Sequence, residues 1–155
     1  MPDAVAVTAP ASSANLGPGF DCLAVALELR NEIVVRAGGT GVSVRVEGEG
    51  AAAAPGDASN LFVRAMAATG VEPAGLEIAM RNRVPFARGL GSSAATIAAG
   101  VAAGLAWQGR EDDPLPAAVG LEGHPDNVAA ALLGGVTLAY AALGRRGPDV
   151  RRRSS

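Results

Sequence analysis

The order of apolar and polar residues along the chain predicts mainly strands in its first half and alanine-rich helices in its second. From residue 42 to residue 47, valine alternates with Ser, Arg and Glu, which is the two-residue period of a strand with one exposed face. Further strands are expected at residues 4–9, 24–29, 32–37, 76–80 and 136–143. Residues 10–19, rich in Ser, Gly and Pro, predict a loop, and Arg30-Asn31 predicts a turn.

Helices are predicted where alanine-rich stretches lie between capping residues and glycines. One is expected from about residues 57–60 to residue 69, capped by Asp57 or Ser59 and ended by Gly70. The stretches 92–107 and 115–122 predict two more, and a short helix after the loop 123–127 ends at Leu133. The charged tail, residues 144–155, has almost nothing to bury and is expected to be disordered.

The composition fits a globular protein whose core is filled mainly by small side chains. Of the 155 residues, 49% are hydrophobic but only 3% are aromatic, and 21 are glycine. A net charge of −2 gives no field that would attract nucleic acid or an anionic membrane. The apolar stretches 89–108 and 128–143 are expected to be buried elements and not membrane spans, and the first residues lack the features of a signal peptide.

Three residue counts exclude several kinds of chemistry. All 13 basic residues are arginine, which excludes a Walker-type phosphate loop and Schiff-base catalysis, because both require lysine. The single cysteine, Cys22, cannot form an internal disulfide, and one histidine is too few for a structural zinc cluster. We therefore expect a reducing, cytoplasmic setting.

The strongest chemical signal is the segment Pro85 to Ala95, PFARGLGSSAA, between a predicted strand and a predicted helix. Its glycines let the backbone approach a ligand closely, and the helix that follows directs unpaired N–H groups and its positive dipole end outward. This arrangement suits phosphate. Without lysine, the charge of a triphosphate would be balanced by Mg²⁺, arginine and backbone dipoles. Taken alone, however, Gly-Ser-Ser is more often a turn whose serines cap an ordinary helix.

Two further segments concentrate polar residues in predicted loops. Residues 10–22, PASSANLGPGFDC, carry Asn15 and Asp21, an amide and a carboxylate suited to the ammonium group of an amino acid. Residues 122–127, EGHPDN, place the one histidine of the chain among two acidic residues and an asparagine. Taken singly, each is explained by turn-capping residues or a structural histidine, and Ser59-Asn60-Leu61 is merely a helix start.

Together these segments resemble the GHMP kinase superfamily and, within it, the homoserine kinase branch. Order and spacing match over about residues 5–140. The glycine-rich segment is shared across the superfamily and implies an ATP-dependent small-molecule kinase, whereas the other two segments point to homoserine. The resemblance implies transfer of the ATP γ-phosphate to the side-chain hydroxyl of L-homoserine, a step toward threonine. It also implies an α+β fold, a mixed sheet with helices on one side, of the ribosomal protein S5 domain 2-like type.

The resemblance also assigns roles to individual residues. Ser93 and Glu122 would hold Mg²⁺, and Asn127 and Asp126 lie in the loop that is catalytic in relatives, with Asn127 positioning the reacting hydroxyl. Homoserine would be bound by Asn15 and Asp21 at its ammonium group, by His124 near its carboxylate, and by Asn127. ATP would be bound by Asn60 near the base or ribose, and by Pro85, Arg88, Gly89, Leu90, Gly91, Ser92, Ser93, Ala94 and Ala95 along the phosphate loop.

One departure from the superfamily concerns length. Its members have a second, C-terminal domain, and residues 144–155 do not resemble the start of one. We therefore expect residues 1–143 to form the N-terminal ATP-binding domain, the C-terminal domain to be absent, and the substrate site to be incomplete. Two alternatives stay open: a GHMP kinase for another small alcohol such as mevalonate or a sugar, and a non-catalytic nucleotide-binding module. The sequence also leaves a homodimer open.

Overall fold

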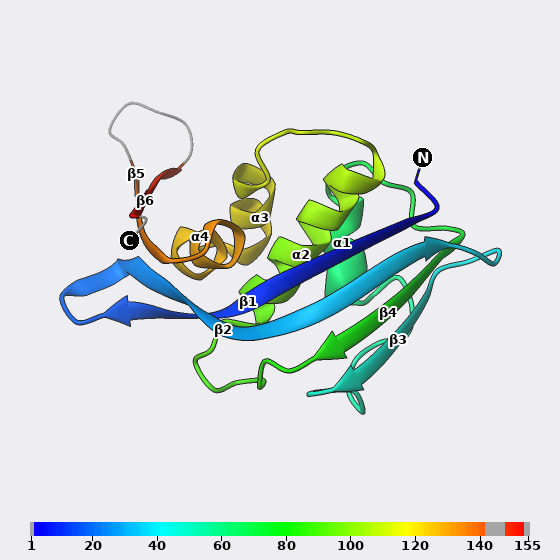
Figure 1. Cartoon of the computed structure of the whole chain (residues 1–155), viewed down its shortest axis with the longest axis horizontal. Coiled ribbons are helices and arrows are strands. Elements are labelled where there is room, and N and C mark those ends of the chain that lie inside the picture. Colours follow the sequence, from blue (N-terminus) through cyan, green and yellow to red (C-terminus); the bar gives the residue numbers. More distant parts are fainter. Residues whose placement is uncertain (1, 142–147, 154–155) are drawn as a thin grey trace.

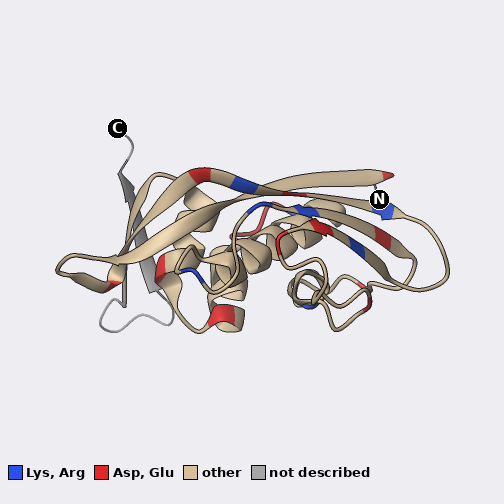
Figure 2. Ribbon diagram, turned by 90° about the horizontal axis from the view of Figure 1, so that it is seen from below, with Lys and Arg blue, Asp and Glu red and all other residues tan. Residues whose placement is uncertain are grey.

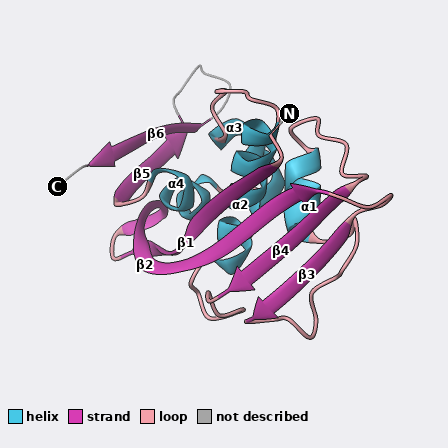
Figure 3. Cartoon of the chain, turned by 45° about the vertical axis from the view of Figure 1, so that its right-hand side comes forward, coloured by secondary structure: helices cyan, strands magenta, loops and turns pink. Residues whose placement is uncertain are grey.

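The computed structural model describes residues 2–141 and 148–153, which form a mixed sheet covered by helices. The strands are β1 (Ala4–Leu16), β2 (Gly19–Ala37), β3 (Ser43–Gly48), β4 (Leu76–Asn82), β5 (Val136–Ala141) and β6 (Pro148–Arg153). The helices are α1 (Leu61–Ala67), α2 (Ser92–Trp107), α3 (Leu115–Glu122) and α4 (Pro125–Leu133). Figures 1 and 3 show these helices on one side of the sheet, which confirms the predicted α+β class. None of them is long and apolar enough to cross a membrane.

Strand β2 joins the parts of the sheet to one another. The strand order is β3-β4-β2-β5-β6, and β1 also pairs with β2. Along its length β2 pairs antiparallel with β1, and it pairs with β4 through residues 32–37 and with β5 through residues 23–25. The β3–β4 pair is parallel. One strand therefore carries both the part of the sheet under α1 and α2 and the part that reaches α4.

The predicted turn at Arg30-Asn31 is wrong, because both residues lie within the continuous strand β2. Asn31 is fully buried, and its Oδ1 accepts hydrogen bonds from the backbone N–H groups of Arg83 and Val84, at 2.8 and 3.0 Å. Buried polar groups are stable when they are hydrogen-bonded in this way. The polar residue that suggested a turn is thus an acceptor that fixes the segment following β4.

Two other predictions of irregular chain are also corrected. Residues 10–16, expected as a loop, extend strand β1, with register shifts between Pro10 and Ser12 and between Ala14 and Leu16. Such irregularities accommodate a proline, which cannot donate to the ladder. In the tail expected to be disordered, residues 148–153 pair antiparallel with β5, because this pairing satisfies backbone groups of both strands. Residues 144–147 and 154–155 of that tail lie outside the described residues.

Helix α2 is packed on two sides, which explains its alanine-rich, uncharged sequence. Because nearly all of this helix is buried, it requires apolar residues around its whole circumference. One buried cluster lies between the sheet and helices α1 and α2, and includes Ile33, Val35, Phe62, Met66, Ile78, Met80 and Trp107. A second lies among α2, α3 and α4, and includes Ala94, Ile97, Val101, Leu105, Ala118 and Val128.

Charged side chains lie mainly outside these apolar layers. Figure 2 shows acidic and basic residues interspersed along the strands. Glu32 pairs with Arg83 at 3.1 Å and Arg45 pairs with Glu47 at 3.0 Å, and all four side chains are largely exposed. Exposed pairs of this kind contribute about 0–1 kcal/mol each. These ion pairs therefore contribute little compared with the two buried apolar clusters.

Two glycines of α2 let α1 approach it closely. A Cβ atom at Gly100 would lie 2.6 Å from the Ala65 Cβ and 2.6 Å from the Phe62 backbone oxygen. A Cβ atom at Gly104 would collide with the Thr69 hydroxyl. The two helices are thus nearly in backbone contact, and a side chain at either glycine would push α1 away from α2.

Replacing Gly100 by alanine should destabilise the fold, although alanine is the better helix former. We expect overpacking to lower the free energy of unfolding by about 1–3 kcal/mol. The control is Gly120→Ala in α3, where an added Cβ would meet no described atom within 4 Å and should stabilise by about 0.5–1 kcal/mol. Urea unfolding of both variants measures the effect, and equal changes would contradict the close packing of α1 on α2.

Candidate active site

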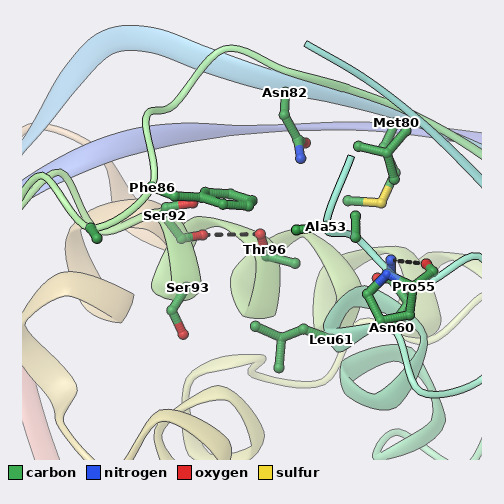
Figure 4. A pocket seen from close by; sticks show the side chains of 13 residues that line it. Ala53, Pro55, Asn60, Leu61, Met80, Asn82, Phe86, Ser92, Ser93 and Thr96 are labelled. Atoms are coloured by element: carbon green, nitrogen blue, oxygen red, sulfur yellow. Dashed lines mark hydrogen bonds between the residues drawn. The ribbon is translucent and has the colours of Figure 1, made fainter. Parts of the chain in front are cut away.

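A pocket of about 360 Å³ opens between strands β3 and β4, the start of α1 and the first turns of α2 (Figure 4). Mostly apolar walls with a few polar groups are typical of small-molecule sites. The apolar side chains suit the faces of a planar ring. The lining side chains include Val46, Pro55, Asn60, Leu61, Met80, Asn82, Phe86, Ser92, Ser93 and Thr96.

The predicted phosphate loop lies beside this pocket, since Ser92 and Ser93 belong to both. Gly89 and Gly91 have φ angles of +71° and +62°, a left-handed conformation that glycine adopts without steric cost. Gly91 is the N-cap residue of α2, and no side chain among the described residues caps this end of the helix. The first N–H groups of α2 are therefore available to an anion, and the helix dipole adds positive potential there.

A buried serine connects this loop to the rest of the site. Ser12 in β1 is fully buried, its backbone N–H donates to the Leu90 carbonyl at 3.1 Å, and its Oγ donates to the Asn127 Oδ1 at 2.9 Å. A Cβ atom at Gly91 would collide with the Ser12 Oγ and lie 3.1 Å from the Asn127 Oδ1. Strand β1, the phosphate loop and the first turn of α4 thus meet at one residue.

Ser93 and Glu122, the residues predicted to share Mg²⁺, are in direct contact. The Ser93 Oγ donates to the Glu122 Oε2 at 2.7 Å at the surface of the protein. Among the described residues, no cluster of three or more His, Cys, Asp and Glu side chains could hold a metal ion. One carboxylate and one hydroxyl still fit Mg²⁺, which commonly takes its other ligands from phosphate oxygens and water. Their role as metal ligands stays a prediction.

Asn15 and Asp21 are brought together at the turn between β1 and β2. The Asp21 backbone N–H donates to the Asn15 Oδ1 at 2.7 Å, and both residues have positive φ angles, +60° and +55°. Among residues with a Cβ, asparagine and aspartate tolerate this region best. Both are exposed, and Figure 1 shows the turn extending beyond α4 at one end of the sheet. The pair stays a predicted substrate site.

His124, Asp126 and Asn127 surround the start of α4. His124 is exposed, whereas Asp126 is only 4% exposed and its Oδ1 accepts the Asn127 backbone N–H at 2.7 Å. Asn127 is half-buried and held by Ser12 next to the phosphate loop. No hydrogen bond among the described side chains joins His124 to Asn15 or Asp21. The predicted homoserine residues thus lie in two segments, the turn between β1 and β2 and the start of α4.

Asn60 lines the pocket as predicted, but its amide is engaged within the protein. Its Oδ1 accepts the Phe62 backbone N–H at 2.9 Å, and its Nδ2 donates to the Pro55 carbonyl at 2.8 Å. Asn60 therefore caps α1, in place of the predicted Asp57 or Ser59. The hydroxyl and backbone N–H of Ser59 instead donate to Asp57, which keeps the pKa of the Asp57 carboxyl below its ordinary value.

Two lining residues, Asn82 and Phe86, were not singled out from the sequence. Phe86 is 42% exposed within the predicted loop. An aromatic residue in a glycine-rich loop was the feature of the sequence that could have indicated a ligand contact. Asn82 continues the inward-facing positions of β4, after Met80, where burial alternates residue by residue. A polar residue at an inward position was the signal there. Arg88, predicted for the nucleotide, is exposed in the same loop.

The contact between Gly91 and Ser12 can be tested with alanine. Gly89→Ala should cost about 1–2 kcal/mol, because alanine is strained at a positive φ angle and an added Cβ meets no described atom within 4 Å. Gly91→Ala should cost about 1–3 kcal/mol more, since its Cβ also collides with the serine. Urea unfolding gives both values. In a Ser12→Ala background the difference between the two should shrink, and an unchanged difference would refute the contact.

Known proteins with similar sequences match nearly the whole chain. The family described as GHMP kinases N terminal domain matches residues 59–135. A homoserine kinase of Streptomyces coelicolor is 48% identical over 151 residues, which cover 91% of this chain and 49% of that protein. A homoserine kinase of Mycolicibacterium vanbaalenii is 47% identical over 156 residues, which cover 94% and 49%. The chain thus spans about half the length of the curated relatives it matches.

Solved structures show the same fold. A homoserine kinase from Cytophaga hutchinsonii has a TM-score of 0.80 and 32% identity, over 98% of this chain and 52% of that one. Mevalonate kinase from Methanococcus jannaschii has a TM-score of 0.67 and 15% identity, over 86% and 52%. By sequence and fold, the chain belongs to the GHMP kinase superfamily and corresponds to its N-terminal domain.

Proposed function

We propose that the chain is the ATP-binding half of a homoserine kinase, which phosphorylates the side-chain hydroxyl of L-homoserine on the way to threonine. The observation that carries this proposal is the continuity of the apolar pocket with the N-terminus of α2. A base in the pocket places the phosphates over the free N–H groups of that helix. The identity of 48% to a homoserine kinase of Streptomyces coelicolor supports homoserine as the substrate.

The phosphate loop binds and orients the nucleotide in this proposal. Backbone N–H groups from Gly89 to Ala94 donate to the β- and γ-phosphates, and the glycines, which the positive φ angles favour, have no side chains to obstruct them. Ser93 and Glu122 hold Mg²⁺, which supplies neutralisation of the phosphate charge when it is bound. The chain itself thus fixes the γ-phosphate at the start of α2, near Asn127.

Asn127 positions the hydroxyl that receives the phosphate. Ser12 engages the oxygen of the Asn127 amide, so the Nδ2 end is left to donate to a substrate oxygen. Asn15 and Asp21 bind the ammonium group, and His124 approaches the carboxylate. Asp126 is less suited to act as a base, because it is buried and holds the first turn of α4. With a loose transition state, orientation and charge neutralisation supply most of the rate.

The metal role can be tested with Glu122→Gln, which preserves the shape of the side chain and removes its charge. Affinity for Mg²⁺-ATP should fall about tenfold or more, about 1.4 kcal/mol, while affinity for metal-free ATP should change little. Titration calorimetry with and without Mg²⁺ separates the two. Glu111→Gln, in an exposed loop, is the control. An equal loss in both titrations would show that Glu122 does not act through the metal.

The substrate assignment can be tested by restoring the length of the relatives. We expect a fusion of residues 1–143 to the C-terminal half of the Streptomyces coelicolor homoserine kinase to phosphorylate homoserine, but not mevalonate or galactose. The unfused chain should be slower by orders of magnitude, because orienting two reactants accounts for roughly 7–11 kcal/mol of barrier. A coupled ADP assay measures all three alcohols. A preference for mevalonate or galactose would refute the homoserine assignment, and an unfused chain as fast as the fusion would refute the proposed half-site.

A further inference from the structure

The pocket contains two asparagines that differ in how their amides are bonded. Both ends of the Asn60 amide are engaged, by Pro55 and Phe62. Asn82 is 4% exposed, its Nδ2 makes one long bond of 3.3 Å to the Glu49 carbonyl, and among the described residues its Oδ1 has no hydrogen-bond donor. Buried acceptors are nearly always paired in folded proteins. A ligand donor would supply the bond that the protein does not.

The position of Asn82 fits a role toward a ligand in this pocket. Figure 4 shows its side chain projecting from β4 into the pocket, between Phe86 and Met80. Thr96 lies across the pocket, but its hydroxyl already donates to the Ser92 carbonyl at 2.9 Å. None of the described lining residues carries a charge. The pocket therefore suits a neutral planar ring, and the Asn82 amide is its buried side-chain group with hydrogen-bonding capacity left, whereas the less buried Ser92 hydroxyl lies at the phosphate-loop end.

We propose that Asn82 recognises the 6-position of the purine base and thereby makes the pocket selective for adenine. This inference rests on the proposed nucleotide-binding function. The Oδ1 accepts an N–H of the exocyclic amine, and the Nδ2 proton not used by Glu49 donates to the neighbouring ring nitrogen, the pattern by which asparagine recognises adenine.

The same geometry disfavours a 6-oxopurine. Hypoxanthine places a carbonyl oxygen where adenine has its amine, so two acceptors would face each other and the Oδ1 would stay unpaired. A site that hydrogen-bonds one group rejects an analogue lacking it far more strongly than an apolar pocket does. Asn60, whose amide is already engaged, should contribute to the shape of the pocket and not to this choice.

The experiment compares ATP with inosine triphosphate, which differ at the 6-position, by titration calorimetry on the full chain. The wild type should prefer ATP by about tenfold or more. Asn82→Leu should abolish the preference, and Asn82→Asp should also lose it, because its second carboxylate oxygen would face the acceptor ring nitrogen of adenine and could accept the ring N–H of hypoxanthine. Thr96→Val is the matched control, because it removes a pocket hydroxyl that is already bonded, and its preference should equal that of the wild type. A ratio of two affinities on one sample does not depend on the folded fraction.

Three outcomes would overturn the inference. Equal affinity of the wild type for ATP and inosine triphosphate would overturn it. This result needs no variant, so the inference can be tested even if Asn82→Leu fails to fold. An unchanged preference in a folded Asn82→Leu variant would also do so. Binding of neither nucleotide to the wild type would refute the nucleotide-binding proposal itself, and it differs from the other outcomes because affinity is lost and not selectivity.

Discussion

The hydrogen bond between Ser12 and Asn127 is the contact on which the geometry of the site depends. It joins residues 115 positions apart, and the Ser12 backbone also holds the carbonyl of Leu90. A displacement of β1 at this point would therefore move the phosphate loop and the Asn127 amide together. The serine also occupies the space beside Gly91, so the glycine is required by its neighbour as well as by its φ angle. The register shift after Pro10 brings the strand to this position.

The two halves of the site are built in different ways. The proposed nucleotide half is a mostly apolar pocket whose wall includes the start of α1, and the close approach at Gly100 fixes where that helix lies. The proposed substrate half consists of exposed groups, with Asn15 and Asp21 at a turn and His124 at the start of α4. Buried contacts thus define the apolar pocket, whereas the predicted substrate groups are positioned through the backbone of β1, β2 and α4.

Local sequence predicted what depends on local interactions. Helices α2 and α3 have the predicted bounds, because alanine favours helix and glycine or proline marks the ends. Ser93 and Glu122 were predicted, from a resemblance, to share Mg²⁺; they lie in contact, and their role as metal ligands stays a prediction. Asn31 was misinterpreted because its partner Arg83 is 52 residues away. For the same reason, nothing local distinguished Asn60, which is satisfied within the protein, from Asn82, which is not.

The long-range pairing of β2 also bears on the order in which the parts of the chain fold. Residues 46–96 supply the described pocket walls, whereas Thr137 of β5 bonds to Ala24, 113 residues earlier. Contacts of such long sequence separation form late, because closing the loop between them lowers the chain entropy before the contact can stabilise the fold. During synthesis from the N-terminus, the walls of the pocket emerge before α4 and β5. A growing chain should therefore gain its apolar pocket before the Asn127 amide is in place, so that a nucleotide bound as proposed would stabilise a partly folded chain.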